Sequence, residues 1–479
     1  MRTTTGWCRT GSPGRWVVAL GAVVLAALAA DGRAQPVAGD RVQPVAALRL
    51  ATFDVDASPP VGTRMAYEVS VREADLPLRC RGIVIVGAGA PIVLCAIDWI
   101  GIGNGAHDAF RAALAAAAAT TPDRVAVHAL HQHDAPQADF TAEKLLADLG
   151  VQSSARFDGM LARDVMRRAG EAIGRALPGA RPVTHVGFGR AVVEGIASNR
   201  RLIGDDGRLR AWRASATKDP LLRAEPDGTI DPMVRALVLF DGTTPLAVLT
   251  AYATHPMSYY RTAVPGPDFP GIARLLRTQD LPAALHVHFT GAGGNVAAGK
   301  YNDGAHANRV VLATRLAAGM RQAYEAAEAD RRPVAAADVG FAAVPVVLAA
   351  RADLDRAALE KSVREGTDRG TFAAADTLAF LERVRQGHAI PVTCLRIGRV
   401  RMLHLPGELF VEYQLAAQQM RPDLDVMMAA YGDYGPGYIG TAKAYGEGGY
   451  EVLPTSSFVG PDAEAPLLDA IGTLLEAKP

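Results

Sequence analysis

The chain has 479 residues, of which 49% are hydrophobic, and its 50 Lys and Arg residues balance its 50 Asp and Glu residues. This length allows one large domain or two to three ordinary ones, and the apolar share is enough to bury a sizeable core. Because there is no basic surplus, the composition argues against a nucleic-acid-binding protein.

The first 34 residues have the pattern of an export signal. Three arginines precede the apolar run 16–30, and small residues around the basic Arg33 lead to Ala34. This predicts a secretory signal peptide over 1–34 and a secreted or periplasmic protein. A membrane anchor is the alternative, disfavoured because the run is shorter than the ~20 residues that span a bilayer. No later segment is long and apolar enough to cross a membrane, so none is expected in the mature chain.

Strand-like and helix-like segments alternate along the rest of the chain, which predicts a single large mixed α/β catalytic domain over 35–479. Short apolar runs typical of buried strands lie at 82–87, 91–100, 124–131, 245–255 and 283–289. Helical spacing is present at 107–119, 155–177 and 306–329. Residues 394–405 predict a hairpin turning at Gly398, and the charged stretch 351–386 predicts a helical insertion.

The cysteines that follow the signal do not form a recognisable framework. Their number is odd and their spacing irregular: they are Cys80, Cys95 and Cys394. One pair can form a disulfide in an oxidising compartment, but no CxxC pattern exists and no cysteine is assigned to a metal site.

The segment His131-Gln132-His133-Asp134 is the strongest local signal for chemistry. It follows an apolar strand in which alternate residues share a face, so both imidazoles extend that face at the strand end. Two histidines at this spacing can share a metal, or one can bind it while the other moves protons. The alternative is that the two histidines are a hydrogen-bonded pair with a structural role at the strand end. Asp134 can orient a neighbouring imidazole or cap the loop.

Further histidines lie at the ends of two later strands. His255 precedes Pro256, which stops the strand, and ligands gather at the carboxyl ends of strands in α/β sheets. His286 and His288 form a second HxH pair, followed by the glycine-rich loop 291–299. This loop allows close backbone approach but is not a phosphate loop, because no GK[ST] follows.

Two later segments offer oxygen ligands. Glu408 follows Pro406-Gly407, which ends a strand. A carboxylate at this position can bind a metal. The residues alone favour another interpretation, a glutamate in the first turn of a helix. The Gly/Tyr-rich segment 431–450 can pack at a rim, contact substrate or supply a phenolate ligand.

In this order, the motifs resemble the neutral/alkaline ceramidase family from about Leu48 to the end. The similar segments are "ATFDVDASPPVGTRMA", "HQHDAP", "ATHPMS", "PGELF" and "GYIGTAKAYGEGGYE". The resemblance implies one zinc ion per chain with four ligands: His131, His255, Glu408 and Tyr438. It also implies that His133 exchanges protons near the metal, and it gives His286 and His288 no role as ligands.

The chain departs from the family pattern in two places. Its "AGGNVAAG" segment has Asn295 at the family's aspartate position, a candidate catalytic position, and Ala297 at its functional serine position. From the resemblance, we expect this chain to lack the family's C-terminal immunoglobulin-like domain. Without the hydroxyl at Ala297, and with Lys300 and Tyr301 available to bind a polar head group, we expect a smaller or more polar substrate than ceramide.

The resulting hypothesis is a zinc-activated water attacking an amide or ester bond, including that of an N-acyl lipid or another small amide. The rival is a secreted binding protein on a degenerate enzyme fold, supported by the missing Ser and Asp; turnover of N-acyl amides and esters separates the two. A serine hydrolase is less favoured because no GxSxG motif occurs. Nothing in the sequence fixes the oligomeric state.

Overall fold

The structure, a computed structural model, describes residues 47–151, 157–366 and 368–476. The predicted signal peptide lies outside these residues. Within them, no helix combines the length and apolar character needed to cross a membrane.

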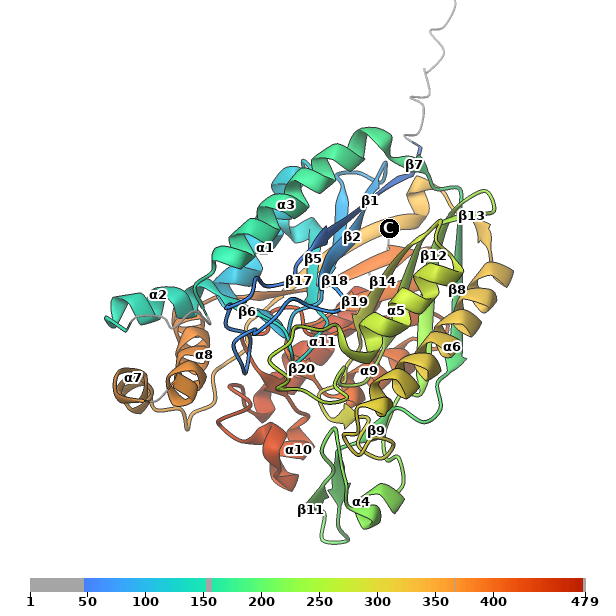
Figure 1. The fold of residues 1–479 in the computed structure, drawn as a ribbon. Helices are drawn as coiled ribbons and strands as arrows, with labels where there is room; N and C mark the ends of the chain where they lie inside the picture. The colour runs from blue at the N-terminus through green and yellow to red at the C-terminus, as the bar shows by residue number, and fades with distance from the viewer. Residues whose placement is uncertain (1–46, 152–156, 367, 477–479) are drawn as a thin grey trace, which may run out of the picture. The chain divides into compact units, whose positions relative to one another are not determined.

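Three sheets form the framework of the unit that begins at Ala46 (Figure 1). The first has the order β5-β3-β2-β1-β7, comprising Val125–Ala129, Ile92–Ile97, Arg79–Val86, Arg49–Asp56 and Arg181–Pro182. The second has the order β14-β13-β12-β8-β16, comprising Leu285–Thr290, Thr244–Tyr252, Met233–Asp241, His185–Val192 and Arg332–Pro333. The third has the order β17-β18-β19-β21, comprising Val339–Val346, Ile390–Ile397, Val400–His404 and Asp425–Ala429.

Most neighbouring strands are antiparallel, but each sheet contains one parallel pair: β3 with β5, β13 with β14, and β19 with β21. The carboxyl ends of parallel strands meet at one edge of a sheet, and loops that leave such edges are where α/β folds bind ligands. Each of the three sheets therefore provides one such edge.

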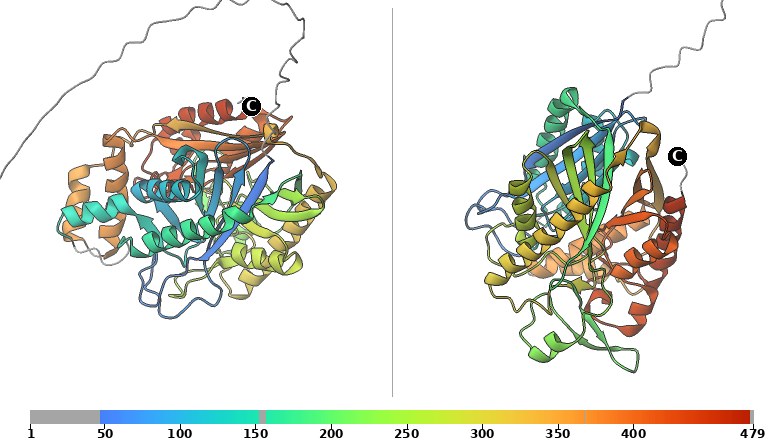
Figure 2. Two further views of the ribbon diagram at one scale, coloured as in Figure 1. Left: turned by 90° about the horizontal axis from the view of Figure 1, so that it is seen from above. Right: turned by 90° about the vertical axis from the view of Figure 1, so that its right-hand side faces the viewer.

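The three sheets share a single apolar core on their inner faces, and helices cover the outer faces (Figures 1 and 2). Helices α1 (Asn104–Ala117) and α3 (Met160–Ala176) pack on the first sheet, and α5 (Asp268–Asp280) and α6 (Ala307–Ala329) on the second. Helices α9 (Val411–Met420) and α11 (Glu464–Glu476) pack on the third.

The period-two pattern of β2 explains this layering. Ile83 and Ile85 belong to the shared inner core, whereas Cys80 and Val84 face the helices of the first sheet. Successive strand residues point to opposite faces, so an almost wholly apolar strand is buried on both sides. The Sγ atom of Cys80 lies 3.6 Å from that of Cys95 on β3, and both thiols are free.

A group of helices with its own small core lies beside the first sheet. It consists of α2 (Phe140–Asp148), α7 (Arg356–Glu365) and α8 (Asp368–Arg385), which pack through apolar residues of all three. The remaining short elements are β4 (Gly101–Gly103), β6 (Gln137–Asp139), β9 (Ser198–Asn199), β10 (Arg201–Ile203), β11 (Leu209–Trp212), α4 (Pro220–Ala224), β15 (Val296–Ala297), β20 (Glu408–Leu409), β22 (Tyr438–Ile439) and α10 (Ala442–Glu447).

The mixed α/β class predicted from the sequence is confirmed, and its strand and helix segments coincide with observed elements. The predicted hairpin is β18–β19, which pair with Ile397 opposite Val400. Gly398 in its turn has a φ of 56°, a backbone conformation that glycine adopts without strain.

Candidate metal centre

The candidate ligands follow strands of the three parallel pairs, at the carboxyl-end edge of each sheet. His131 follows β5, His255 follows β13, Glu408 opens β20 after β19, and Tyr438 opens β22 after β21. The parallel pairing of β20 with β22 places Glu408 directly beside Tyr438. Residues more than 300 positions apart thus meet because the strand ends of all three sheets converge.

The glycines next to these segments allow the close approach. A side chain at Gly294 would meet the backbone oxygen of Glu408 at 2.2 Å, and one at Gly407 would meet Gly437 O at 2.6 Å. The glycine-rich loop after β14 therefore packs against the ligand-bearing backbone.

Three contacts link the ligand atoms of these four residues at separations expected around one metal ion. His131 Nε2 and His255 Nε2 lie 3.2 and 3.1 Å from Glu408 Oε2, and Tyr438 Oη lies 3.3 Å from His255 Nε2. Four ligands in a tetrahedron with bonds of about 2.0–2.1 Å are separated by roughly 3.3–3.4 Å, so the set fits zinc. Glu408 Oε2 and His131 Nε2 are buried without a hydrogen-bond partner, as a pair of metal-directed atoms would be.

Backbone carbonyls fix the orientation of two of the histidine rings. His131 Nδ1 lies 2.7 Å from Ile100 O, and His255 Nδ1 lies 2.8 Å from Gly293 O. Donation from Nδ1–H to a carbonyl leaves the Nε2 lone pair free for a metal, the arrangement found around protein-bound metals. Both rings are therefore held in an orientation that suits a metal ligand.

His133 belongs to the same cluster but is held differently. Nitrogens of His131, His133 and His255 all lie within 4.8 Å of one another. Neither nitrogen of His133 has a hydrogen-bond partner, and its ring stacks on Tyr67 with centroids 5.7 Å apart. Without an orienting carbonyl, this imidazole can take up and release a proton, whereas a third nitrogen ligand would be expected to be fixed.

Burial and mutual contacts set the charges of the cluster. Burial lowers the pKa of His255 to about 4, and burial together with the other two histidines lowers the pKa of His133 well below its ordinary value. Burial acts to raise the pKa of Glu408, but His131 and His255 outweigh it and hold that pKa well below its usual range. A deprotonated Glu408 and a neutral His255 are the forms that bind a divalent cation.

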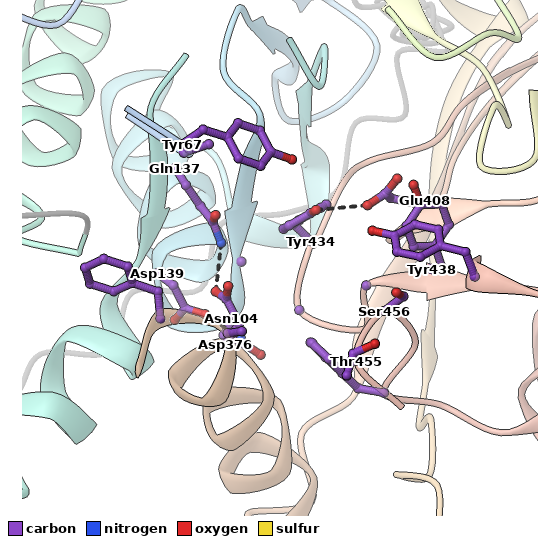
Figure 3. A pocket seen from close by; sticks show the side chains of 18 of the residues that line it. Tyr67, Asn104, Gln137, Asp139, Asp376, Glu408, Tyr434, Tyr438, Thr455 and Ser456 are labelled. Atoms are coloured by element: carbon purple, nitrogen blue, oxygen red, sulfur yellow. Dashed lines mark hydrogen bonds between the residues drawn. The ribbon is translucent and has the colours of Figure 1, made fainter. Parts of the chain in front are cut away.

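Two further residues hold the oxygen ligands. Tyr434 donates from its hydroxyl to Glu408 Oε1 at 2.9 Å (Figure 3), and Arg200 donates from Nη1 to Tyr438 Oη at 3.0 Å. Burial raises the pKa of Tyr438 well above its usual value, while Arg200 acts in the opposite direction. Sequence reasoning missed Arg200. Arg200 follows the polar pair Ser198-Asn199 of β9, and its burial arises from tertiary contacts, so the sequence carried no local signal for it.

The backbone carries strain at this centre. His131 and Tyr431 have φ values of 67° and 62°, a region that residues other than glycine rarely occupy, and their rings stack with centroids 4.7 Å apart. Such outliers cluster at functional sites, where the surrounding structure holds them in place. The cross-sheet bonds Ala129 N to Tyr431 O and Ala430 N to Thr290 O, both 3.0 Å, provide that support.

A cavity of about 220 Å³ opens beside the oxygen ligands, with Glu408, Tyr434 and Tyr438 on one side (Figure 3). Its far wall contains Asn104, Gln137, Asp139 and Asp376. A substrate in this cavity lies next to Glu408 and Tyr438, whereas His131, His133 and His255 are not among the residues that line it.

Two other residues singled out in the sequence, Asp134 and Asn295, do not line this cavity themselves. Asp134 accepts bonds from the backbone of Arg261 and Thr262, so it shapes that loop rather than orienting an imidazole. Asn295 accepts from Val411 N and donates to Glu412, which ties it to the start of α9.

The remaining loop residues also have partners of their own. Ala297 is fully buried in the two-residue pairing of β15 with β9, opposite Ser198. Lys300 donates to Glu225 O at 2.7 Å, and Tyr301 donates to Asp227 at 2.7 Å. Ala297, Lys300 and Tyr301 do not line the cavity, so the expected polar contact with substrate has no support at these positions.

The second HxH pair is separate from the metal cluster. His286 Nε2 lies 3.3 Å from Leu281 O, and His288 Nδ1 lies 2.9 Å from Thr250 Oγ1. Among the described residues, the histidine, cysteine and acidic groups that can hold a metal include neither of them.

Comparison with known proteins gives structural likeness only. No protein-family model matches the chain, and no curated protein sequence does. A solved ceramidase in complex with C2 superposes with a TM-score of 0.64 at 16% identity, over 90% of this chain and 75% of the solved one. The neutral ceramidase of Pseudomonas aeruginosa gives a TM-score of 0.63 at 17% identity over the same shares. The chain has the neutral ceramidase fold. This confirms the fold that the sequence motifs implied.

Proposed function

We propose that this protein is a zinc-dependent hydrolase, exported from the cell, that cleaves amide or ester bonds. The observation that carries the proposal is the convergence of His131, His255, Glu408 and Tyr438 at separations of 3.1–3.3 Å between adjoining ligand atoms. A ligand set of imidazoles and one carboxylate is ordinary for catalytic zinc. The N-terminal pattern supports export.

The residues of this chain would divide the work. His131, His255, Glu408 and Tyr438 would hold the zinc, which when bound supplies an acidified water and polarises a carbonyl. Glu408 is fixed by Tyr434, and the phenol of Tyr438 by Arg200. His133, buried beside the ligands with both nitrogens unbonded, would carry the proton to the leaving group.

The substrate class follows from the shared fold and from the cavity. Two solved proteins of similar fold are named as ceramidases, and Glu408 and Tyr438 of the proposed ligand set line the cavity. An N-acyl amide or related ester is therefore the proposed substrate. The alternative of a non-catalytic binding protein drew support from the missing hydroxyl at Ala297. That support weakens because Ala297 does not line the cavity.

Turnover of a panel of N-acyl amides and p-nitrophenyl esters tests the proposal, with zinc measured on the same preparation. We expect hydrolysis that a chelator abolishes and added zinc restores. A zinc-replete protein that turns over no member of the panel would leave the binding-protein alternative standing.

A further inference from the structure

The arginine that contacts Tyr438 is itself held by residues from other segments. Arg200 is 4% exposed, and its Nη1 atom donates to Tyr438 Oη at 3.0 Å and to Gly294 O at 3.3 Å. Burial of a guanidinium is costly unless a negative charge lies close to it. The contacts of Arg200 away from Tyr438 therefore determine where the guanidinium lies and in which direction Nη1 points.

Glu451 supplies a negative charge next to Arg200. It is fully buried in the short helix η4 (Tyr450–Val452), and its Oε1 atom lies 3.6 Å from Arg200 Nε. The same Oε1 accepts a hydrogen bond from Trp212 Nε1 at 2.6 Å. The ring of Trp212 also lies against the guanidinium, whose central carbon is 4.6 Å from the ring centroid, a cation–π distance. Glu451 and Trp212 thus hold Arg200 while Nη1 reaches Tyr438.

The other oxygen of Glu451 contacts a second arginine, which provides a control. Glu451 Oε2 lies 3.2 Å from Arg201 Nη1, and Arg201 Nη2 lies 3.1 Å from Glu447 Oε2 and 2.7 Å from Gly448 O. Glu447 and Glu451 are both largely buried carboxylates paired with Arg201, and Glu451 in addition pairs with Arg200. Removal of one charge or the other therefore separates an effect on Arg200 from an effect on Arg201.

From these contacts, and resting on the proposed function, we propose that Glu451 is a positioning residue for the metal ligand Tyr438, acting through Arg200. The ion pair and the Trp212 ring leave the planar guanidinium in one orientation, in which Nη1 meets the phenol oxygen. Without the charge of Glu451, Arg200 turns toward other acceptors and the Tyr438 side chain loses its partner. Tyr438 then reaches the zinc less often, and the zinc binds more weakly.

The zinc affinity of two matched variants tests the proposal, measured by competition with a chromophoric chelator at fixed pH. Glu451→Gln keeps the shape of the side chain but removes its charge, and its amide NH2 group offers donors where Arg200 and Arg201 need an acceptor. Loss of a residue that orients a metal ligand typically costs roughly 10–100-fold in affinity, so we expect about tenfold weaker zinc binding for a residue that acts through Arg200. Glu447→Gln should change the zinc affinity by less than about twofold, as an independent site would.

A double-mutant cycle shows whether Glu451 acts through Tyr438. In the Tyr438→Phe background the other three proposed ligands remain, but Arg200 has no phenol oxygen to hold. Glu451→Gln should therefore change the zinc affinity in this background by less than about twofold. A merely structural role of Glu451 would weaken zinc binding by the same factor in both backgrounds.

The outcomes separate this inference from the proposed function. A wild type that binds no zinc contradicts the proposed function and the inference with it. If the wild type binds zinc, three results overturn the inference alone: Glu451→Gln binds zinc as tightly as the wild type, Glu447→Gln loses as much affinity as Glu451→Gln, or the loss is equal in both backgrounds.

Trp212→Phe decides the matter if Glu451→Gln does not fold. This substitution removes the donor to Glu451 Oε1 and keeps an aromatic ring beside Arg200. We expect it to weaken zinc binding by about threefold or more in the wild-type background and to leave the affinity of Tyr438→Phe unchanged. An unchanged affinity in the wild-type background, or an equal loss in both backgrounds, overturns the inference.

Discussion

The hydrogen bond from Tyr434 to Glu408 provides a sharp test of the metal centre because the chain contains a matched control. Tyr434→Phe removes one hydroxyl, which donates to Glu408 Oε1 at 2.9 Å. Tyr431→Phe also removes one buried hydroxyl next to the same cluster, but that hydroxyl has no hydrogen-bond partner. Both substitutions keep the aromatic ring.

The two substitutions should differ in their effects on zinc affinity and on the stability of the fold. A hydrogen bond to a charged group contributes about 1.5–3 kcal/mol, and loss of a partner that orients a metal ligand typically costs 10–100-fold in metal affinity or activity. These figures agree, since a tenfold change corresponds to about 1.4 kcal/mol. Tyr434→Phe should therefore weaken zinc affinity by 10–100-fold. Tyr431→Phe should leave it unchanged and should stabilise the fold slightly, because an unpaired buried hydroxyl is removed.

Competition for zinc with a chromophoric chelator at fixed pH measures both affinities, and thermal unfolding of the zinc-free proteins measures the stabilities. Equal zinc affinity in the wild type and Tyr434→Phe would refute the orienting role of Tyr434. An equal loss in both variants would show that the hydroxyls act through packing and not through Glu408.

Three further predictions follow from the same contacts. His131→Ala and His255→Ala should lose the zinc while His286→Ala retains it, measured by elemental analysis; release of zinc from His286→Ala alone would contradict the choice between the two HxH pairs. His133→Ala should retain zinc but lower the hydrolytic rate constant by roughly 10²–10⁴, the usual contribution of a general acid or base; a normal rate would reduce His133 to a structural role. Burial raises the pKa of Asp139 to about 8, far above the ~3.9 of an unfolded chain, so the wild type should lose stability as pH rises from about 4 to 8. The melting temperature of Asp139→Asn, which keeps a helix-capping side chain, should increasingly exceed that of the wild type over this range, and a constant difference would contradict the assignment.

The sequence predicted the parts of the site that depend on local periodicity. Alternation along β5 placed His131 at a strand end, and Pro256 marked the end of the strand before His255. Glu408 was ambiguous because a residue before a helix serves equally as a cap or as a ligand. The parallel pairing of β20 with β22 places Glu408 in a short strand beside Tyr438, and such pairing between distant segments leaves no local signal.

The loop after β14 shows that residues close to the glycine-rich segment in sequence need not line the cavity. Asn295, Lys300 and Tyr301 are close in sequence to a glycine-rich loop at the centre, but their side chains turn toward α9 and toward the segment around Asp227. The backbone of this loop, rather than its side chains, contributes to the site by packing against Glu408 and accepting from His255 Nδ1. Side-chain direction in an irregular loop follows from tertiary contacts that periodicity does not encode.

We propose that one zinc ion held by His131, His255, Glu408 and Tyr438 is required for hydrolysis. Titration of chelator-treated protein with zinc, while hydrolysis of a responsive ester or amide is followed, tests this requirement. We expect no turnover without metal and a linear rise that reaches a plateau at one zinc per chain. Full turnover by the metal-free protein, or a plateau that requires two zinc ions, would contradict it.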